Sequence, residues 1–299
     1  MLKYLKIGLE NHLKGGFFSM YENIHRHYSA AGDLGTLDFN GESEYCNFPG
    51  DDLTIAKGYS KVIESLASVL SPGMIQLGRK VAKIEWQSGN CCLDLENGDS
   101  TKPVKLHFRD GSVIPPLPSF KAQEISRLGF GVVDKLFLQL SPNHDENVGY
   151  DEMDFPNMRM VFHPSGAHLS HPKIPLWIRR TALIHPIYPK SSVLVSWFAG
   201  EEALEVDNLD DEEIINGVST TMSQFLANSK HFKNSNSIKF SKILKCKWGT
   251  DPLFLGSYSY IAVGSSGDDF DAIAEPLPKG NLQNSLNFKC YFQVTTTSS

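Results

Sequence analysis

The chain has 299 residues, of which 41% are hydrophobic, and its 28 lysines and arginines against 34 aspartates and glutamates leave a net charge of −6. This is the composition of a globular protein, and its acidic balance argues against non-specific nucleic-acid binding and mildly favours a cationic ligand. The five cysteines form no CxxC pair, so neither a zinc site nor a disulfide framework is indicated, and a reducing compartment fits best. No run of about 18 apolar residues occurs, so the sequence predicts no membrane span.

The N-terminal part of the sequence is predicted to be helical. Leucines recur at helical spacing over residues 2–13, and the stretch 17–30 is expected to continue as a second helix. A loop rich in turn residues follows, and then a helix that ends at Ser71-Pro72-Gly73. One face of this helix is apolar and consists of Tyr59, Val62, Ile63, Leu66, Val69 and Leu70.

The next part of the sequence changes to the two-residue period of β-strands. The short runs MIQL, KVAKIEWQ, CCLDLE and PVKLHF are separated by turn residues, which predicts a β-meander. After the turn at Asp110-Gly111, only Ser112-Val113-Ile114 remain before Pro115-Pro116. Two adjacent prolines end a strand, so we expect part of the sheet to be missing there.

Helices and strands interleave in the rest of the chain. We predict a short helix over SFKAQEISRL, capped by Ser119, and an amphipathic helix with acids in its first turn over DDEEIINGVSTTMSQFLA. Strands are predicted over GFGVVDKLFLQL, over the pair LWIRRTALIHP and SSVLVSWFAG, and over SIKFSKILKCKW. Because there is no regular βαβ alternation, the predicted fold class is α+β, with a mixed sheet flanked by helices and a smaller β-rich part near the meander.

Aromatic and small residues gather in the stretch WGTDPLFLGSYSYIAVGSSGDD, from Trp248 to Asp269. Tyr258 and Tyr260 alternate with serines, so both rings are expected on one face of a strand. The glycines allow the backbone to approach something flat, and an aromatic face beside a flat ligand can hold an amine by cation–π attraction. A well-packed core strand followed by a Gly/Ser turn explains the same pattern equally well.

Lys135 lies in a strand that is otherwise rich in apolar residues. Such a lysine is either an edge residue that prevents aggregation or a functional ammonium, and composition alone favours the edge residue.

Three histidines, His163, His168 and His171, lie close together in a predicted loop. No acid or cysteine completes a ligand set around them, so no metal site is predicted. The sequence also contains no GxSxG, Walker-type or GxGxxG motif.

Several blocks of the sequence resemble the flavin-dependent amine oxidases. WGTDPLFLGSYSYIAVGSSGDDFDAIAEPLP is most similar to a motif of the plant polyamine oxidases, and the lysine-specific histone demethylases come second. Over residues 32–278, in the same order as in that family, the resemblance includes FPGDDLTIAKGYSKVIESLASVLSPGMIQLGRKVAKIEW, PPLPSFKAQEISRLGFGVVDKLFLQL, and IPLWIRRTALI with SVLVSWFAGEEALE.

The resemblance implies FAD as cofactor, a polyamine as substrate, and molecular oxygen as the acceptor that leaves as hydrogen peroxide. Lys135 matches the family lysine that holds a water near flavin N5, and it is the expected catalytic residue. Val81 matches a residue at the adenosine end of FAD, and Trp248 a tryptophan beside the isoalloxazine. Tyr258, with Tyr260 on the same face, is expected to line the substrate channel for amines such as spermine or thermospermine.

The sequence also departs from the family. The strand–GxGxxG–helix that seats the FAD pyrophosphate and the GEAT-like flavin motif are absent, so we expect an incomplete, Rossmann-like FAD-binding domain beside an amine-oxidase substrate domain. The expected division is substrate-domain helices and loop over 1–57, a remnant of the FAD-binding domain over 58–114, the substrate-binding domain over 115–275, and a divergent tail over 276–299.

Two functions therefore remain open for the chain. The first is a polyamine oxidase whose truncated chain is weakly active or inactive. The second is a non-catalytic, truncated isoform that acts, if at all, as a binding or regulatory remnant. Neither a signal peptide nor a peroxisomal address is found in the sequence, so a cytoplasmic location is expected.

Overall fold

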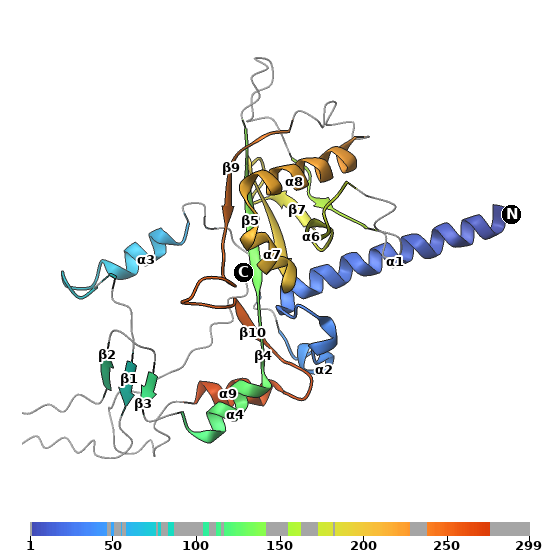
Figure 1. The fold of residues 1–299 in the computed structure, drawn as a ribbon. Helices are drawn as coiled ribbons and strands as arrows, with labels where there is room; N and C mark the ends of the chain where they lie inside the picture. The colour runs from blue at the N-terminus through green and yellow to red at the C-terminus, as the bar shows by residue number, and fades with distance from the viewer. Residues whose placement is uncertain are drawn as a thin grey trace, which may run out of the picture. The chain divides into compact units, whose positions relative to one another are not determined.

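The computed structural model describes residues 2–46, 49–50, 55, 58–75, 77–78, 83–86, 104–107, 112–114, 117–141, 155–162, 173–181, 183–227 and 238–275 (Figure 1). The chain divides into two compact units. The larger unit contains residues 1–45 and 128–266, and the smaller unit contains residues 46–127 and 267–294. The described helices include none that is long and apolar enough to span a membrane.

A five-stranded antiparallel sheet forms the centre of the larger unit. Its strands, in the order β6-β7-β8-β5-β9, are β6 (Met158–Arg159), β7 (Leu183–Pro186), β8 (Val193–Ala199), β5 (Val133–Leu140) and β9 (Phe240–Lys245). β5 is an inner strand, hydrogen-bonded to β8 on one side and β9 on the other (Figure 1). The predicted strands over 133–140, 193–199 and 240–245 are thus confirmed, as is the pairing of β7 with β8.

One predicted strand is wrong in its first half. The sequence LWIR, which we predicted to begin a strand, forms the helical turn α6 (Leu176–Arg179), and only Leu183–Pro186 is extended. Trp177 and Ile178 are buried in the core from this turn. Packing of these two side chains overrides the β-propensity of the segment.

The helices of the larger unit begin with α1 (Leu2–Ser29), which is one continuous helix rather than the two that were predicted. A 3-10 turn, η1 (Leu34–Thr36), and α2 (Phe39–Glu42) follow it. After β8 come α7 (Glu201–Asn208) and α8 (Asp211–Leu226). The predicted acidic start of α8 is confirmed: Asp210 and Glu213 form a capping box, and Asp211, Glu212 and Glu213 lie in the first turn.

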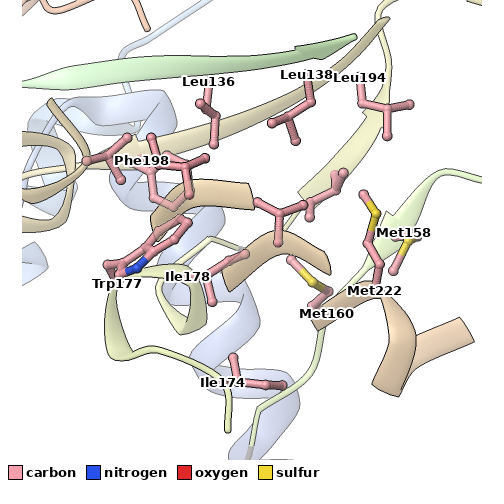
Figure 2. Close-up of a cluster of buried hydrophobic side chains, with 14 of the residues drawn as sticks. Leu136, Leu138, Met158, Met160, Ile174, Trp177, Ile178, Leu194, Phe198 and Met222 are labelled. Carbon is pink, nitrogen blue, oxygen red and sulfur yellow. The ribbon is translucent and has the colours of Figure 1, made fainter. Parts of the chain in front are cut away.

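The main hydrophobic core lies between one face of the sheet and helices α6, α7 and α8. Figure 2 shows Leu136 and Leu138 of β5 pointing toward Trp177, Ile178 and the surrounding side chains. The core consists of Leu136, Leu138, Leu140, Phe155, Met158, Met160, Phe162, Ile174, Trp177, Ile178, Ile184, Leu194, Phe198, Ala203, Val206, Ile214, Val218, Met222 and Leu226. Each large side chain buried here stabilises the fold by about 1.5–3 kcal/mol relative to its exposed state.

A second, two-stranded sheet pairs β4 (Gly129–Gly131) with β10 (Tyr258–Tyr260). The predicted strand over 129–140 is therefore two strands in two sheets. At Gly131 a Cβ would lie 1.8 Å from the carbonyl oxygen of Ala30, and at Gly129 it would lie 2.2 Å from the ring of Tyr260. Only glycine leaves room for these contacts, which is why the strand is entered through glycines.

The smaller unit contains α3 (Ser60–Ala67), β1 (Lys83–Trp86), β2 (Val104–His107), β3 (Ser112–Ile114), α4 (Ser119–Arg127) and α9 (Gly267–Ala274). Within α4 and α9, the buried Lys121 Nζ donates to the carbonyl oxygen of Ile273, 2.6 Å away, and Arg127 forms an ion pair with Asp269. The ammonium of Lys121 thus satisfies carbonyls at the C-terminal end of α9.

The described strands of the smaller unit differ from a simple meander. β1 pairs with β2 in antiparallel fashion, as predicted, but β3 pairs with β1 in parallel, so the strand order is β2-β1-β3. The predicted run CCLDLE lies outside the described residues. The run MIQL is not a strand where it is described, because Met74, Ile75 and Leu77 lie in coil and turn and are exposed.

Candidate functional site

Lys135 lies on an inner strand, so the interpretation of this residue as an edge lysine is wrong. Its cross-strand partner in β8 is Trp197. On the other side, the carbonyl oxygen of Lys135 accepts a hydrogen bond from the N–H of Cys246 at 3.2 Å. The Lys135 Nζ lies 4.1 Å from the centroid of the Trp197 ring, which is cation–π geometry. Burial lowers the pKa of the Lys135 ammonium, and the neighbouring Cys246 thiol opposes this shift.

The face of the sheet that carries Lys135 also carries a small aromatic cluster. Ala30, Val133 and Ala199 are buried at its centre, and Trp197, Tyr258 and Tyr260 pack against them. Since side chains alternate along a strand, Val133 and Lys135 point away from the main core, and Ala199 and Trp197 lie opposite them. Tyr258 and Tyr260 reach the same cluster, as residues two apart on one strand should.

The phenol hydroxyl groups of this cluster form hydrogen bonds within the protein. Tyr258 donates a hydrogen bond from its hydroxyl to the carbonyl oxygen of His27, and burial raises the pKa of this phenol. The Tyr260 hydroxyl lies 2.9 Å from Thr36 Oγ1. With the hydroxyl groups bonded to the protein, the ring faces are the parts of these tyrosines that remain for apolar or cation–π contacts.

His27 brings a neutral imidazole close to this cluster. Burial, and after it the positive charge of Arg26, lowers the pKa of His27 to about 3. The guanidinium of Arg26 is held by the carbonyl oxygens of Gly32 and Ala199 and by the carboxylate of Glu202. At neutral pH the charge beside the cluster on this side is therefore that of the Arg26–Glu202 ion pair, and not of the histidine.

Trp248 lies in a turn that follows β9, and its backbone N–H donates to Asp134 Oδ1 at 2.8 Å. The ring contact described for Trp248 is with Phe254, edge-on, with the ring centroids 4.6 Å apart. The side chain is 37% exposed. Lys135 thus contacts Trp197, which packs against the same buried cluster as Tyr258 and Tyr260, whereas Trp248 is connected to β5 through its backbone.

Two glycines of the aromatic stretch accommodate side chains of the chain itself. A Cβ at Gly256 would lie 2.2 Å from the Phe130 ring, and a Cβ at Gly249 would lie 2.6 Å from Leu204. Gly264 has a φ of 88° and open space around it. The flat surface that the backbone approaches at Gly256 is therefore the side chain of Phe130.

Some predicted residues lie outside the described part of the chain, namely Val81 and the histidines His163, His168 and His171. Among the described residues, no group of three or more potential metal-ligating side chains is found. The sequence interpretation also missed three residues of the site, Trp197, Asp134 and His27. Trp197 could have been found only from the register of β5 against β8, because nothing local distinguishes it from a core aromatic.

Comparisons with known proteins identify the family of the chain. The model of the flavin-containing amine oxidoreductase family matches residues 17–284. "Probable polyamine oxidase 5" of Arabidopsis thaliana is 46% identical over 90% of this chain and 53% of its own length. "Polyamine oxidase 1" of Oryza sativa subsp. japonica is 38% identical over 88% of this chain and 54% of its own.

More distant relatives include the human lysine-specific histone demethylase 2, which is 26% identical over 90% of this chain and 30% of its own length. Among solved structures, cyclohexylamine oxidase from Brevibacterium oxydans covers 74% of this chain and 45% of its own, at 12% identity and a TM-score of 0.45. The chain spans about half the length of the plant relatives that it matches. Because the family model covers most of the sequence, the chain belongs to the flavin-containing amine oxidoreductases.

Proposed function

We propose that the chain supplies the amine-binding part of an FAD-dependent polyamine oxidase that oxidises spermine- or thermospermine-type amines with oxygen and releases hydrogen peroxide. The observation that carries this proposal is the half-buried Lys135 on an inner strand, with its Nζ over the ring of Trp197, which packs against the same buried cluster as Tyr258 and Tyr260. The similarity to polyamine oxidases from two plants supports the choice of substrate class.

The family uses FAD, and the described residues fit the reactive end of that cofactor. Lys135 offers an ammonium whose pKa is lowered by burial, and Trp248 offers a partly exposed flat ring. In this proposal Lys135 holds a water at the reacting atoms, Trp248 packs beside the isoalloxazine, and Val81 contacts the adenosine end. When bound, FAD accepts the hydride equivalent of the amine and passes the electrons to oxygen.

Tyr258 and Tyr260 are proposed to form the wall against which the amine lies. Their hydroxyl groups are engaged by His27 and Thr36, so the substrate meets aromatic faces. Such faces remove water from the reacting nitrogen and lower its pKa, which favours the neutral amine that can be oxidised. The other ammonium groups of a polyamine can be held over the rings by cation–π attraction.

We further propose that substrate binding belongs to residues 115–275, that residues 58–114 are the remnant of the FAD-binding domain, that 276–299 are a divergent tail, and that the protein acts in the cytoplasm. An alternative function is a non-catalytic binding or regulatory remnant. One observation favours it: the apolar face of α3 and its flanks is exposed throughout, at Tyr59, Val62, Ile63, Leu66, Val69 and Leu70. A surface of this kind normally contacts another protein surface.

The test is to purify residues 1–299 with added FAD, record the visible spectrum, and measure peroxide release with spermine and thermospermine. We expect low, amine-dependent peroxide release, and a decrease of about 100-fold or more in Lys135→Met, because a group that acts at the reacting atoms is lost. Lys242→Met is the control, since it makes the same change at an exposed position of β9.

Three other outcomes are informative. A chain that neither releases peroxide nor binds spermine in a calorimeter would contradict the oxidase and favour the binding remnant. A stoichiometric flavoprotein with full turnover would contradict weak activity. An equal decrease of peroxide release in Lys135→Met and Lys242→Met would contradict the role of Lys135.

A further inference from the structure

Two buried acids meet behind the turn that carries Trp248. Asp134 of β5 is 1% exposed, and Asp207 of α7 is 4% exposed. Asp134 is adjacent to Lys135 in sequence, but the alternation of the strand places it on the other face of the sheet, toward α7. Both acids belong to the larger unit of the chain.

The two acids bind three consecutive residues. Asp134 Oδ1 accepts a hydrogen bond from the N–H of Trp248 at 2.8 Å, and the same carboxyl group interacts with the N–H of Gly249. Asp207 Oδ2 accepts a hydrogen bond from the hydroxyl of Thr250 at 2.9 Å. Both carboxyl groups therefore bind the turn that carries the Trp248 ring.

The two carboxyl groups also lie close enough for the charge of Asp207 to raise the pKa of Asp134. Their remaining oxygens, Asp134 Oδ2 and Asp207 Oδ1, are buried and receive no hydrogen from the N–H and O–H groups of the described residues. Two carboxylates offer only acceptors, so a hydrogen bond between them requires a proton on one of them. Repulsion between two neighbouring negative charges, together with their burial away from water, also disfavours the state in which both acids are ionised.

The charged and titratable groups that face the pair come from β9 and the residues that follow it. Lys245 of β9 donates from Nζ to the carbonyl oxygens of Asp207 and Leu209, rather than to the carboxyl groups. The charges of Lys245 and Lys247 lower the pKa of Asp207, but burial outweighs them and the net shift is upward. For Asp134, burial and the charge of Asp207 raise the pKa to about 6, although the N–H groups of Trp248 and Gly249 oppose this. Cys246, which follows β9, contributes a thiol whose own pKa is raised by burial, and the charge of Lys135 acts on that thiol.

The turn itself is strained and needs to be held. Lys247 and Leu255, on either side of it, have φ values of 59° and 55°, the left-handed region that non-glycine residues avoid at a cost of roughly 1–2 kcal/mol each. The N–H of Gly256, directly after Leu255, donates to the carbonyl oxygen of Trp248 at 2.9 Å and closes the turn. Contacts from outside the turn must offset the strain, and the two acids supply them.

We propose that Asp134 and Asp207 share one proton and act together as positioning residues, holding residues 248–250 so that the ring of Trp248 keeps one orientation. The importance of that orientation for catalysis rests on the proposed function of Trp248; the positioning itself does not. Deprotonation of the pair at higher pH places two negative charges together, which loosens the hold on the turn.

The experiment uses the chain without cofactor or amine, so that its result is independent of the oxidase proposal. The four tryptophans are labelled with 5-fluorotryptophan, and Trp248→Phe assigns the fluorine signal of Trp248. The signal is followed from pH 5 to pH 8. We expect it to shift with a midpoint near pH 6, the value to which the pKa of Asp134 is raised.

In Asp134→Asn the amide can accept from Trp248 and donate to Asp207 without titrating, so the signal should stay sharp and independent of pH. In Asp134→Ala it should broaden or split at every pH. Asp251→Asn makes the same charge change within the turn, and its Trp248 signal should shift with pH as that of the unaltered chain does.

The proposal is overturned if the Trp248 signal of Asp134→Asn shifts with pH like that of the unaltered chain, or if the signal of the unaltered chain does not move. It is also overturned if all four signals move together, because this would report general unfolding. Should Asp134→Ala not fold, Asp207→Asn provides the second test, with the same pH-independent signal expected.

Discussion

The two faces of the five-stranded sheet differ in what they contribute, although the same strands build both. On one face, Leu136, Leu138 and Phe198 belong to a large core under helices α6, α7 and α8. On the other face, Lys135 and Trp197 border a small cluster with a charged group and partly exposed rings. Successive side chains of β5 and β8 point to opposite faces of the sheet. Residues that stabilise the core therefore alternate with residues of the proposed site. A substitution on the core face should change the unfolding free energy, and one on the other face should change binding or turnover.

The largest expected effect is on the core face. Leu136→Ala removes a side chain that is 0% exposed, and it should lower the unfolding free energy by about 3 kcal/mol, since lost burial and a cavity both contribute. Urea unfolding followed by circular dichroism measures the change. Leu244→Ala is the matched control, because this leucine of the neighbouring strand is 57% exposed and should cost less than about 1 kcal/mol. Equal effects of the two substitutions would contradict the assignment of the core face.

The next effect concerns His27 and depends on pH. Its pKa is about 6.5 when unfolded and is lowered to about 3 in the fold. The unfolded chain therefore binds the proton more readily than the folded chain. The stability that neutral His27 contributes is fully present above pH 6.5 and is lost as the pH falls toward 3. Between pH 7 and pH 5 the unaltered chain should lose about 2 kcal/mol more than His27→Asn does.

The loss of unfolding free energy between pH 7 and pH 5 is measured for the unaltered chain and for His27→Asn. The contributions of the other titrating groups, including Asp134, are the same in both chains and cancel in the comparison. Thermal or urea unfolding at pH 7 and pH 5 gives the two differences. His25→Asn, an exposed position of α1, serves as the control and should behave as the unaltered chain does. If both variants kept the full acid sensitivity, His27 would not be the buried neutral group described here.

The smallest effect separates the two tyrosines of the aromatic cluster. Tyr258→Phe leaves the carbonyl oxygen of His27 without its hydroxyl donor, and it should lower the unfolding free energy by about 1 kcal/mol. Tyr260→Phe removes an exposed contact with Thr36 and should cost less than about 0.5 kcal/mol. Urea unfolding of both variants checks the difference. A larger loss for Tyr260→Phe would show that the anchoring of the cluster lies at Thr36 rather than at His27.

Local patterns were sufficient for several elements. The apolar alternation of β5 and β8 and the acidic, capped start of α8 were predicted from the sequence, because these features depend on neighbours within a few residues. The single helix α1 and the helical turn α6 were not. Gly15 and Gly16 lie inside α1 without ending it, and burial of Trp177 decides the conformation of α6. In both cases contacts from outside the segment outweigh its intrinsic preference.

The sequence by itself determined the blocks that mark the family, the α+β class and the candidate residues Lys135, Tyr258 and Tyr260, since each of these is encoded in a contiguous stretch. Only the tertiary structure decided that β5 is an inner strand, that Trp197 lies opposite Lys135, and that Asp134 meets Asp207 behind Trp248. These pairings join segments that are distant in the chain. They depend on strand register and on the side of the sheet where each helix packs, and no periodicity within a segment specifies either of them.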